Sequence, residues 1–291
     1  IYAWVRIGIN CMKMYELIAF DMDGTLLNSK KEIDKSSLDA IKYATEKGKI
    51  VILSTGRCPS QLQMYVNDIP NLRYLNCLSG AIVYDLKEQK YIYTKTMPFE
   101  TVKTLMDITK GHDVMIELLY KDTFVQKNQC DVIEEYGMGI YKEQYKKWAV
   151  QMDNLIEEFL KAPFEVGKVN FYTRTPEERN LIFKKIIDAN LEVETAYAET
   201  TSIEISSKNT DKSVGLEKLC EHLNLSIKDT IAVGDADNDI GIFKKAGLKI
   251  AMGNANKNIK ALADVIVNDC DNGGCSQAIY NYLLAEKELA L

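Results

Sequence analysis

Histidine is scarce in this sequence, and long apolar runs are missing. The 291 residues contain only His112 and His222, one in a region of mixed pattern and one inside a predicted helix. We therefore do not expect catalysis by histidine. No apolar run approaches the ~18 residues that a membrane span needs, so a membrane partner is not expected either.

An excess of positive charge is also missing. Lys and Arg number 36 against 42 Asp and Glu, which leaves a formal net charge of −6. A protein with this balance has no global field that attracts nucleic acid or anionic lipid, although local basic residues can still bind an anion. The sequence predicts no nucleic-acid partner, and it shows no feature that requires an obligate protein partner.

Cysteines are present, but paired cysteine motifs are not. The seven cysteines form no Cys-x-x-Cys pair, and the closest two, Cys270 and Cys275, lack the second half of a zinc pattern. A chain of this length does not depend on disulfides to fold. We therefore expect a protein of the reducing cytoplasm.

Length and composition indicate a globular protein of about two domains. Hydrophobic residues make up 46% of the chain and charged residues 27%, which is ordinary globular usage. Residues 1–13 are apolar and aromatic but are interrupted by Arg6, and a buried-strand pattern begins only after Met14. We expect Met14 to be the natural start and residues 1–13 to be a non-native or disordered extension.

Strand and helix patterns divide the chain into two kinds of region. Short apolar strands alternate with amphipathic helices in residues 1–98 and 207–291, which predicts an α/β, Rossmann-like core of three layers with a parallel sheet. Residues 99–206 show half-buried strands, a hairpin and a few helices, which favours an inserted α+β domain. The predicted strands are 15–20, 50–53, 114–120, 123–126, 168–172, 192–196, 202–206, 230–233, 248–251 and 265–267, and the predicted core helices are 34–46, 212–223, 238–246, 256–263 and 276–285.

Two carboxylates follow the first predicted strand. In FDMDGTLL, Asp21 and Asp23 stand two residues apart, at the sheet edge where α/β proteins bind ligands. Held close together, they repel each other unless a hard cation such as Mg²⁺ or a shared proton neutralises them. An aspartate can attack phosphorus and form an aspartyl phosphate, while its neighbour transfers protons. The alternative is that Asp-x-Asp-Gly is only a polar turn.

A second acidic loop, GDADND, follows the strand at 230–233. We expect Asp235 to bind the metal, because three carboxylates in five residues are unfavourable without a cation. Asn238 and Asp239 are expected to orient its surroundings, and Asp237 to cap the next helix. An EF-hand is not expected, because the loop lacks the glycine and glutamate that such a site needs.

Groups suited to a phosphate follow the second strand. Ser54, Thr55, Gly56 and Arg57 offer hydroxyls, a backbone amide and a guanidinium. Lys212 begins a helix, where its charge opposes the helix dipole, so we expect it to bind an anion or a carboxylate. The alternatives are an ordinary helix cap beside a surface arginine, and a solvated lysine.

Taken in chain order, DMDGTL, STGR, Lys212 and GDADND resemble the four motifs of the haloacid dehalogenase superfamily of phosphohydrolases. The TGR form, the long insertion between the second and third motifs, and IAMGNA resemble the Cof-like subfamily with a type-IIB cap. The resemblance covers nearly the whole chain from Met14 and is weakest in the inserted domain. It implies a Mg²⁺-dependent phosphatase that hydrolyses small phosphorylated metabolites through an aspartyl phosphate, with residues 99–206 as a cap.

The resemblance also implies a role for each motif residue. Asp21 would be the nucleophile and Asp23 the general acid/base. Mg²⁺ would bind the Asp21 carboxylate, the Asp23 backbone carbonyl and Asp235. The residues that would hold the phosphoryl group are Thr55, Gly56, Lys212 and Asn238, and those that would support the site are Ser54, Arg57 and Asp239.

Some alternatives stay open. Relatives often carry Asn-Gly-Ala where this chain has Ser79-Gly80-Ala81, a difference that could change a substrate contact near the hinge. Asp23 argues against a haloalkanoic dehalogenase, but a sugar phosphomutase and a non-catalytic phospholigand-binding relative are not excluded. Sugar phosphates are the first expected substrates by resemblance, ahead of nucleotides and phosphorylated cofactors. The cap tyrosines that are candidates for the substrate pocket are Tyr120, Tyr141, Tyr172 and Tyr197.

Overall fold

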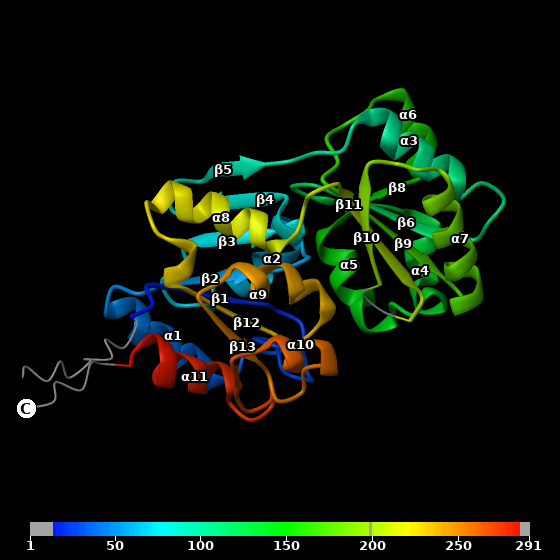
Figure 1. Ribbon diagram of the computed structural model, residues 1–291. Coiled ribbons are helices and arrows are strands. Elements are labelled where there is room, and N and C mark those ends of the chain that lie inside the picture. The colour runs from blue at the N-terminus through cyan, green and yellow to red at the C-terminus, as the bar shows by residue number, and fades with distance from the viewer. Residues whose placement is uncertain (1–13, 198–199, 286–291) are drawn as a thin grey trace, which may run out of the picture.

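The computed structural model describes residues 14–197 and 200–285, which form two sheets in two lobes (Figure 1). The larger sheet has eight strands in the order β14-β13-β12-β1-β2-β3-β4-β5. Its strands are β1 (Leu17–Phe20), β2 (Ile50–Ser54), β3 (Tyr74–Cys77), β4 (Ile82–Asp85), β5 (Lys90–Thr94), β12 (Thr230–Gly234), β13 (Leu248–Ala251) and β14 (Val265–Ile266). The predicted extension, residues 1–13, lies outside the described residues.

Strand β1 lies at the centre of the larger sheet. It pairs in parallel with β12 on one side and with β2 on the other, and all its residues are buried. Helices α1 and α11 lie on one side of the sheet and α8 and α9 on the other (Figure 1). The central strand β1 is covered on both faces and is apolar throughout. The core helices are α1 (Lys35–Glu46), α2 (Pro59–Val66), α8 (Lys212–Leu223), α9 (Ile240–Lys245), α10 (Lys257–Leu262) and α11 (Gly274–Ala278), with the short turns η1 (Leu78–Gly80), η4 (Ile227–Asp229) and η5 (Asp237–Asp239) and the π-helical turn η6 (Ile279–Leu283).

The larger sheet is mixed, which corrects the expectation of a parallel sheet. The strands from β14 to β3 are parallel, but β4 and β5 are antiparallel at the edge. No strand was predicted here. Because β5 is only partly buried, its tyrosines and lysine form no apolar run, and its pairing comes from the neighbouring strand β4.

The smaller sheet has six strands in the order β10-β11-β9-β6-β7-β8 and is antiparallel except where β8 pairs with β7. Its strands are β6 (Val114–Leu119), β7 (Thr123–Gln126), β8 (Ala149–Met152), β9 (Lys168–Thr173), β10 (Val193–Ala196) and β11 (Ser202–Ser207). Its helices are α3 (Phe99–Ile108), α4 (Lys127–Asp131), α5 (Lys142–Trp148), α6 (Leu155–Lys161) and α7 (Pro176–Asp188), with the turns η2 (Ile133–Tyr136) and η3 (Gly139–Tyr141). Strand β8 was not predicted, because its exposed and half-buried residues show no alternation.

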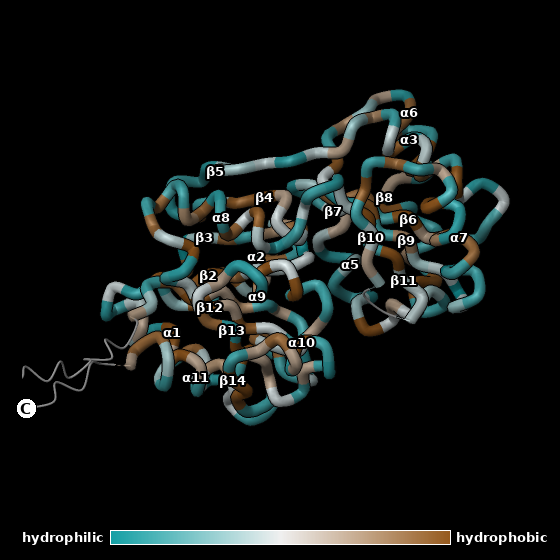
Figure 2. The backbone as a smooth tube through the Cα atoms, viewed as in Figure 1, coloured by the Kyte–Doolittle hydropathy of each residue, from teal (hydrophilic) through white to brown (hydrophobic). Residues whose placement is uncertain are grey.

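The smaller lobe has its own hydrophobic core. Helices α3, α6 and α7 pack on one face of its sheet through side chains such as Ile116, Phe171 and Ile203. Figure 2 shows stretches of hydrophobic residues along the chain inside both lobes. This confirms the prediction of an α+β domain inserted into an α/β core, and we call the smaller lobe the cap. The boundaries at 98/99 and 206/207 stay predictions.

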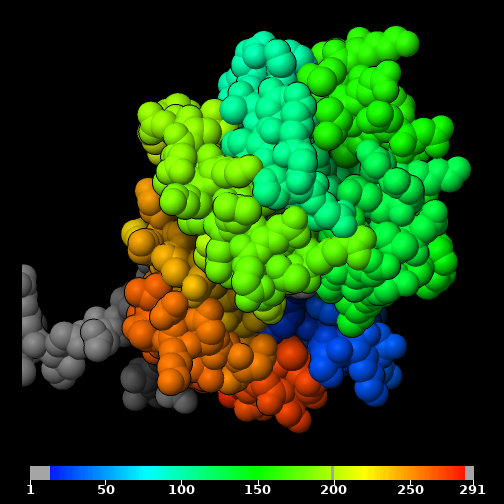
Figure 3. All heavy atoms as spheres, turned by 90° about the vertical axis from the view of Figure 1, so that its right-hand side faces the viewer, coloured from blue at the N-terminus to red at the C-terminus, as the bar shows by residue number. Residues whose placement is uncertain are grey.

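The cap covers one end of the core (Figure 3). Two stretches of chain join the lobes, from β5 to α3 and from β11 to α8, and they run side by side (Figure 1). The ammonium group of Lys95 in the first stretch donates to the carbonyl oxygens of Lys208 and Asn209 in the second, at 2.6 and 3.2 Å. In the described ranges, no helix is long and apolar enough to cross a membrane.

Candidate active site

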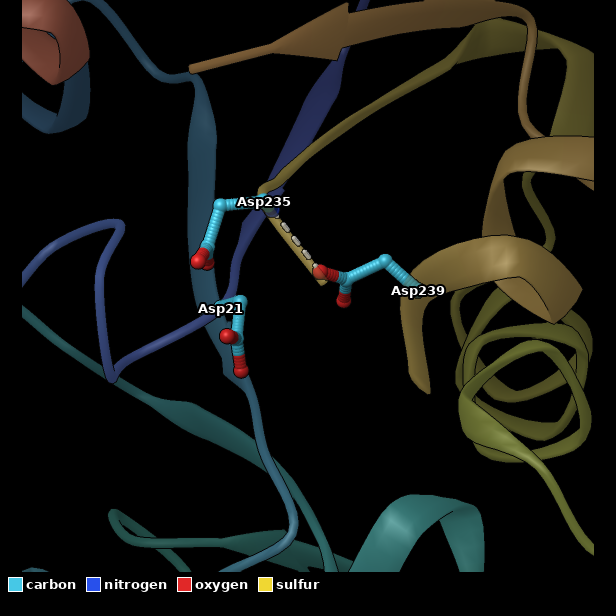
Figure 4. Close-up of side chains that lie close together, drawn as sticks. All are labelled: Asp21, Asp235 and Asp239. Carbon is cyan, nitrogen blue, oxygen red and sulfur yellow. Dashed lines mark hydrogen bonds between the residues drawn. The ribbon is translucent and has the colours of Figure 1, made fainter. Parts of the chain in front are cut away.

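The two acidic loops meet at one edge of the core sheet. Asp21 follows β1 and Asp235 follows β12, and these strands are parallel neighbours, so their carboxyl ends lie together. One carboxylate oxygen from each of Asp21, Asp235 and Asp239 lies within 4.8 Å of the others. Figure 4 shows the three side chains converging, the first two from strand ends and Asp239 from the turn η5.

Gly24 lets the first loop approach Asp235. Its φ is +78°, and a Cβ atom built on it would lie 2.5 Å from Asp235 Oδ2. The next residue confirms the close fit, because the Thr25 hydroxyl donates to Asp235 Oδ1 at 2.8 Å. The Asp-x-Asp-Gly-Thr sequence is therefore more than a polar turn: its glycine and threonine shape the second acidic loop.

Burial makes the negative charges of this cluster unfavourable. The pKa of Asp235 is raised to about 6, first by desolvation and then by the nearby Asp239 carboxylate, although the Thr25 hydrogen bond opposes the shift. Burial also raises the pKa of Asp21, against the opposing effect of Lys212. The arrangement is short of positive charge, and oxygen ligands of this kind suit a hard divalent cation.

Lys212 is fully buried between two carboxylates. Its ammonium group donates to Asp21 Oδ1 at 2.7 Å and to Asp239 Oδ1 at 2.6 Å. Burial alone would lower the pKa of Lys212, but the two carboxylates raise it above its ordinary value. Lys212 begins α8, and it contacts carboxylates there, as one of the two expectations from sequence stated.

Asp239 orients the second acidic loop. Its Oδ2 accepts the backbone N–H groups of Asp235 and Ala236 at 3.0 and 3.3 Å. The expectation that Asp237 caps the next helix is wrong: Asp237 is exposed and accepts from the side-chain amides of Asn256 and Asn258. The N-cap residue of the turn η5 is Ala236, and the side chain of Asp239, three residues later, reaches back to the Ala236 N–H.

Arg57, which the sequence suggested as a phosphate-binding group, pairs with a carboxylate in this structure. Its Nε and Nη2 donate to the two oxygens of Asp23, both at 2.9 Å. Lys31, which sequence reasoning missed, donates to Asp23 Oδ1 at 2.8 Å. Burial raises the pKa of Asp23, but Arg57 and Lys31 outweigh it and bring the pKa to about 2. Asp23 is therefore ionised in this arrangement.

The loop after β2 lies at the same edge. Thr55 and Gly56 line the site, and the Thr55 hydroxyl accepts the backbone N–H of Arg57 at 3.2 Å. Ser54 is buried behind them, where its hydroxyl accepts from the Asn76 side chain at 2.9 Å. Ser54 therefore joins the end of β2 to Asn76 in β3 and does not line the cavity.

A cavity of about 300 Å³ separates these groups from the cap. Predicted residues form its floor, namely Asp21, Asp23, Thr55, Gly56, Asp235 and Asn238. Cap residues form its roof, among them Glu117, Trp148, Asn170, Tyr172, Tyr197 and Glu204. Among the tyrosines proposed for the pocket, Tyr141, Tyr172 and Tyr197 line it, whereas Tyr120 is buried in the core cluster.

The other roof residues, such as Glu117, Asn170 and Glu204, were missed, although the sequence carries a signal for part of the roof. Polar residues alternate with apolar ones in two cap strands, at Lys168, Asn170 and Tyr172 in β9 and at Ser202 and Glu204 in β11. Period-two alternation places such residues on one face of a sheet. Only the tertiary structure shows that this face is turned toward the catalytic edge of the core.

Comparisons with known proteins agree with this geometry. Residues 18–279 match the family model described as haloacid dehalogenase-like hydrolase. A 5-amino-6-(5-phospho-D-ribitylamino)uracil phosphatase of Bacillus subtilis is 27% identical over 92% of this chain and 96% of its own length. The pyridoxal phosphate phosphatase of Escherichia coli is 25% identical over 92% and 98%.

A solved structure supports the fold, cap included. A sugar phosphatase of haloacid dehalogenase subclass IIB superposes with a TM-score of 0.75 and 23% identity, covering 91% of this chain and 98% of that one. At this identity the likeness concerns the fold alone.

Proposed function

Since this chain belongs to the haloacid dehalogenase-like hydrolases, and the two relatives compared above are phosphatases, we propose that it is a Mg²⁺-dependent phosphatase that hydrolyses a small phosphorylated metabolite through an aspartyl phosphate. The observation that supports this most directly is the cluster of Asp21, Asp235, Asp239 and Lys212, of which Asp21 and Asp235 line the cavity. We keep the cytoplasm as its proposed location, on the use of cysteine alone.

The donor set fits a magnesium ion. The carboxylates of Asp21 and Asp235 and the backbone carbonyl of Asp23 would hold it, and all three are hard oxygen ligands. The raised pKa of Asp235 supports this choice, because a cation would remove the unfavourable charge. When bound, Mg²⁺ would neutralise negative charge on the phosphate and on the nucleophile.

Asp21 is the proposed nucleophile. Lys212 holds its Oδ1 at 2.7 Å, so we assign the attack on phosphorus to Oδ2. Lys212, the Thr55 hydroxyl, the Gly56 amide and Asn238 would hold the oxygens of the transferring phosphoryl group. These donors act mainly by position and charge, which is what phosphoryl transfer requires.

Asp23 is the proposed acid and base, and its two roles need opposite protonation states. To protonate the leaving oxygen it must carry a proton, and to activate water for the second step it must be ionised. Arg57 and Lys31 hold it ionised here, at 2.8 to 2.9 Å. The first step therefore requires these ion pairs to loosen, and the entering phosphate is an anion that can compete for Arg57.

The proposal is tested with p-nitrophenyl phosphate and Mg²⁺. Phosphate release should be abolished by Asp21→Asn in a folded protein, and EDTA should abolish it in the wild type. Asp188→Asn, an exposed change of the same kind in α7, is the control that should leave the activity intact. Phosphate binding without release would support a binding protein instead, and sugar-phosphate isomerisation without release would support a phosphomutase.

A further inference from the structure

One row of cap side chains forms the polar roof of the cavity. Glu117 in β6, Asn170 in β9 and Glu204 in β11 are direct cross-strand neighbours, paired as Glu117 with Asn170 and Asn170 with Glu204. All three line the cavity. The alternate residues of these strands pack on α3, α6 and α7, so the pleat turns this row toward the core.

Glu117 is a buried carboxylate with four neutral donors. Gln61 and Tyr145 donate to its Oε1 at 3.1 and 2.8 Å, and Asn170 and Tyr172 donate to its Oε2 at 2.7 and 3.0 Å. Burial raises its pKa against the effect of these bonds. Gln61 belongs to α2 of the core, so Glu117 ties the roof to the floor while keeping an acidic group at the cavity.

Glu204 is held differently, by a lysine. Lys168 is 1% exposed, and its ammonium lies 2.7 Å from Glu204 Oε2 and 3.4 Å from the carbonyl oxygen of Gly56 in the phosphate loop. Glu204 itself is 18% exposed. The buried lysine fixes the Glu204 carboxylate at the cavity, directly above the loop expected to hold the phosphate.

Aromatic rings close the side of the cavity. Tyr145 and Trp148 lie with ring centroids 4.5 Å apart at an angle of 47°, and Tyr197 also lines the space. Three buried polar atoms of lining residues, namely the Trp148 indole N–H and the amide oxygens of Asn170 and Asn238, have no hydrogen-bond partner among the described residues. The cavity thus combines aromatic walls with a roof whose polar groups mostly bond to one another.

This combination disfavours two kinds of leaving group. A sugar carries several hydroxyls that each need partners, and most polar groups of the roof already bond to one another. A second anionic group would meet two carboxylates and one ammonium in a desolvated space. A flat ring with a few N–H or O–H donors satisfies both conditions, because its faces contact the aromatic walls and its donors reach the acceptors.

Resting on the proposed phosphatase activity, we propose that the cap selects phosphate esters of a neutral or cationic nitrogen-containing aromatic ring. The Glu204 carboxylate and the Asn170 amide oxygen accept hydrogen bonds from the ring substituents, and Trp148 contacts its face. Glu204 and Asn170 are then specificity-determining residues of this chain, and Lys168 is a positioning residue that acts through Glu204.

The test compares four esters by kcat/KM with Mg²⁺ present. Pyridoxamine 5′-phosphate carries the proposed ring. Benzyl phosphate keeps a phosphate ester on a CH₂ group attached to an aromatic ring but lacks the polar ring substituents. Glucose 6-phosphate and 6-phosphogluconate differ by a carboxylate. We expect kcat/KM for pyridoxamine 5′-phosphate to exceed that for benzyl phosphate by about tenfold or more, the equivalent of one charge-assisted hydrogen bond. The kcat/KM for glucose 6-phosphate should be lower, and that for 6-phosphogluconate lowest.

Glu204→Gln removes the charge and keeps the shape. It should lower kcat/KM for pyridoxamine 5′-phosphate about tenfold more than for benzyl phosphate, and should narrow the gap between glucose 6-phosphate and 6-phosphogluconate. Trp148→Leu should lower kcat/KM by a similar factor for both aromatic esters. Glu177→Gln, an exposed change in α7 on the opposite face of the cap sheet, is the matched control.

The outcomes separate this inference from the phosphatase proposal. A preference for glucose 6-phosphate over both aromatic esters, or equal losses for both aromatic esters in Glu204→Gln, overturns the selection of a nitrogen-containing ring while phosphate release upholds the phosphatase. If no ester is hydrolysed, p-nitrophenyl phosphate included, the phosphatase proposal fails and the inference fails with it. Circular dichroism of each variant confirms that it is folded.

Discussion

Replacing Asp235 by asparagine should stabilise the metal-free protein and weaken its stabilisation by Mg²⁺. The pKa of Asp235 is raised from 3.8 to about 6, chiefly by burial. The folded state then binds protons more readily than the unfolded state, so stability falls as pH rises from about 4 to about 6. The asparagine side chain carries no charge, keeps an acceptor for the Thr25 hydroxyl and escapes this loss.

The size of the effect follows from the shift. A difference of about two pKa units corresponds to about 3 kcal/mol above pH 6, and partial exposure of the side chain reduces this to about 2 kcal/mol. For a chain of this size, that raises Tm by about 4 to 8 °C. Mg²⁺ at a hundred times its Kd would stabilise the wild type by about 2.7 kcal/mol and the variant much less.

The assay is thermal unfolding of wild type and Asp235→Asn in EDTA at pH 7.5 and at pH 4, and in excess Mg²⁺ at pH 7.5. We expect the variant to melt higher in EDTA at pH 7.5, to lose this advantage at pH 4, and to fall behind the wild type in Mg²⁺. Asp188→Asn should match the wild type in every condition. The reasoning would be refuted by a variant with a lower Tm than the wild type in EDTA, or by a difference in Tm that is the same at pH 7.5 and pH 4.

Three further substitutions test the remaining groups. Gly24→Ala should cost about 1 to 2 kcal/mol of stability in denaturant unfolding and at least tenfold in kcat, because its Cβ would lie 2.5 Å from Asp235 Oδ2 and its φ is +78°; an unchanged kcat would contradict the fit. Lys212→Met should destabilise the metal-free protein by about 3 to 5 kcal/mol in the same assay, since it leaves Asp21 and Asp239 buried and unpaired; a smaller loss below pH 4 would confirm the cause. Arg57→Met should raise the pKa of Asp23 from about 2 and move the alkaline limb of the pH profile of kcat/KM to higher pH, because the first step needs Asp23 protonated; a limb that stays in place would show that Asp23 does not set it.

Local sequence was sufficient where a feature depends on a few adjacent residues. The predicted helix at 212–223 and strand at 248–251 match α8 and β13, because caps and short apolar runs are local signals. The four motifs also follow from local chemistry, and the resemblance built on them is confirmed for the family and the enzyme class. The catalytic roles of the individual residues stay predictions.

Contacts between distant segments could not be inferred in the same way. Arg57 meets Asp23 across two strand ends, Lys31 joins them from a loop, and β4 and β5 gain their pairing only from the sheet edge. Asp237 was misassigned because helix capping and binding to the asparagines near α10 look identical in sequence.

The sequence by itself determined the chemistry available: oxygen ligands after two buried strands, a lysine at a helix start, and an inserted domain between the second and third motifs. The tertiary structure decided how these groups are charged and what lies above them. Burial raises the pKa of Asp235, while ion pairs lower that of Asp23, and both effects depend on groups brought together by folding. The acidic and aromatic roof exists only because the cap sheet turns one face of its pleat toward the core.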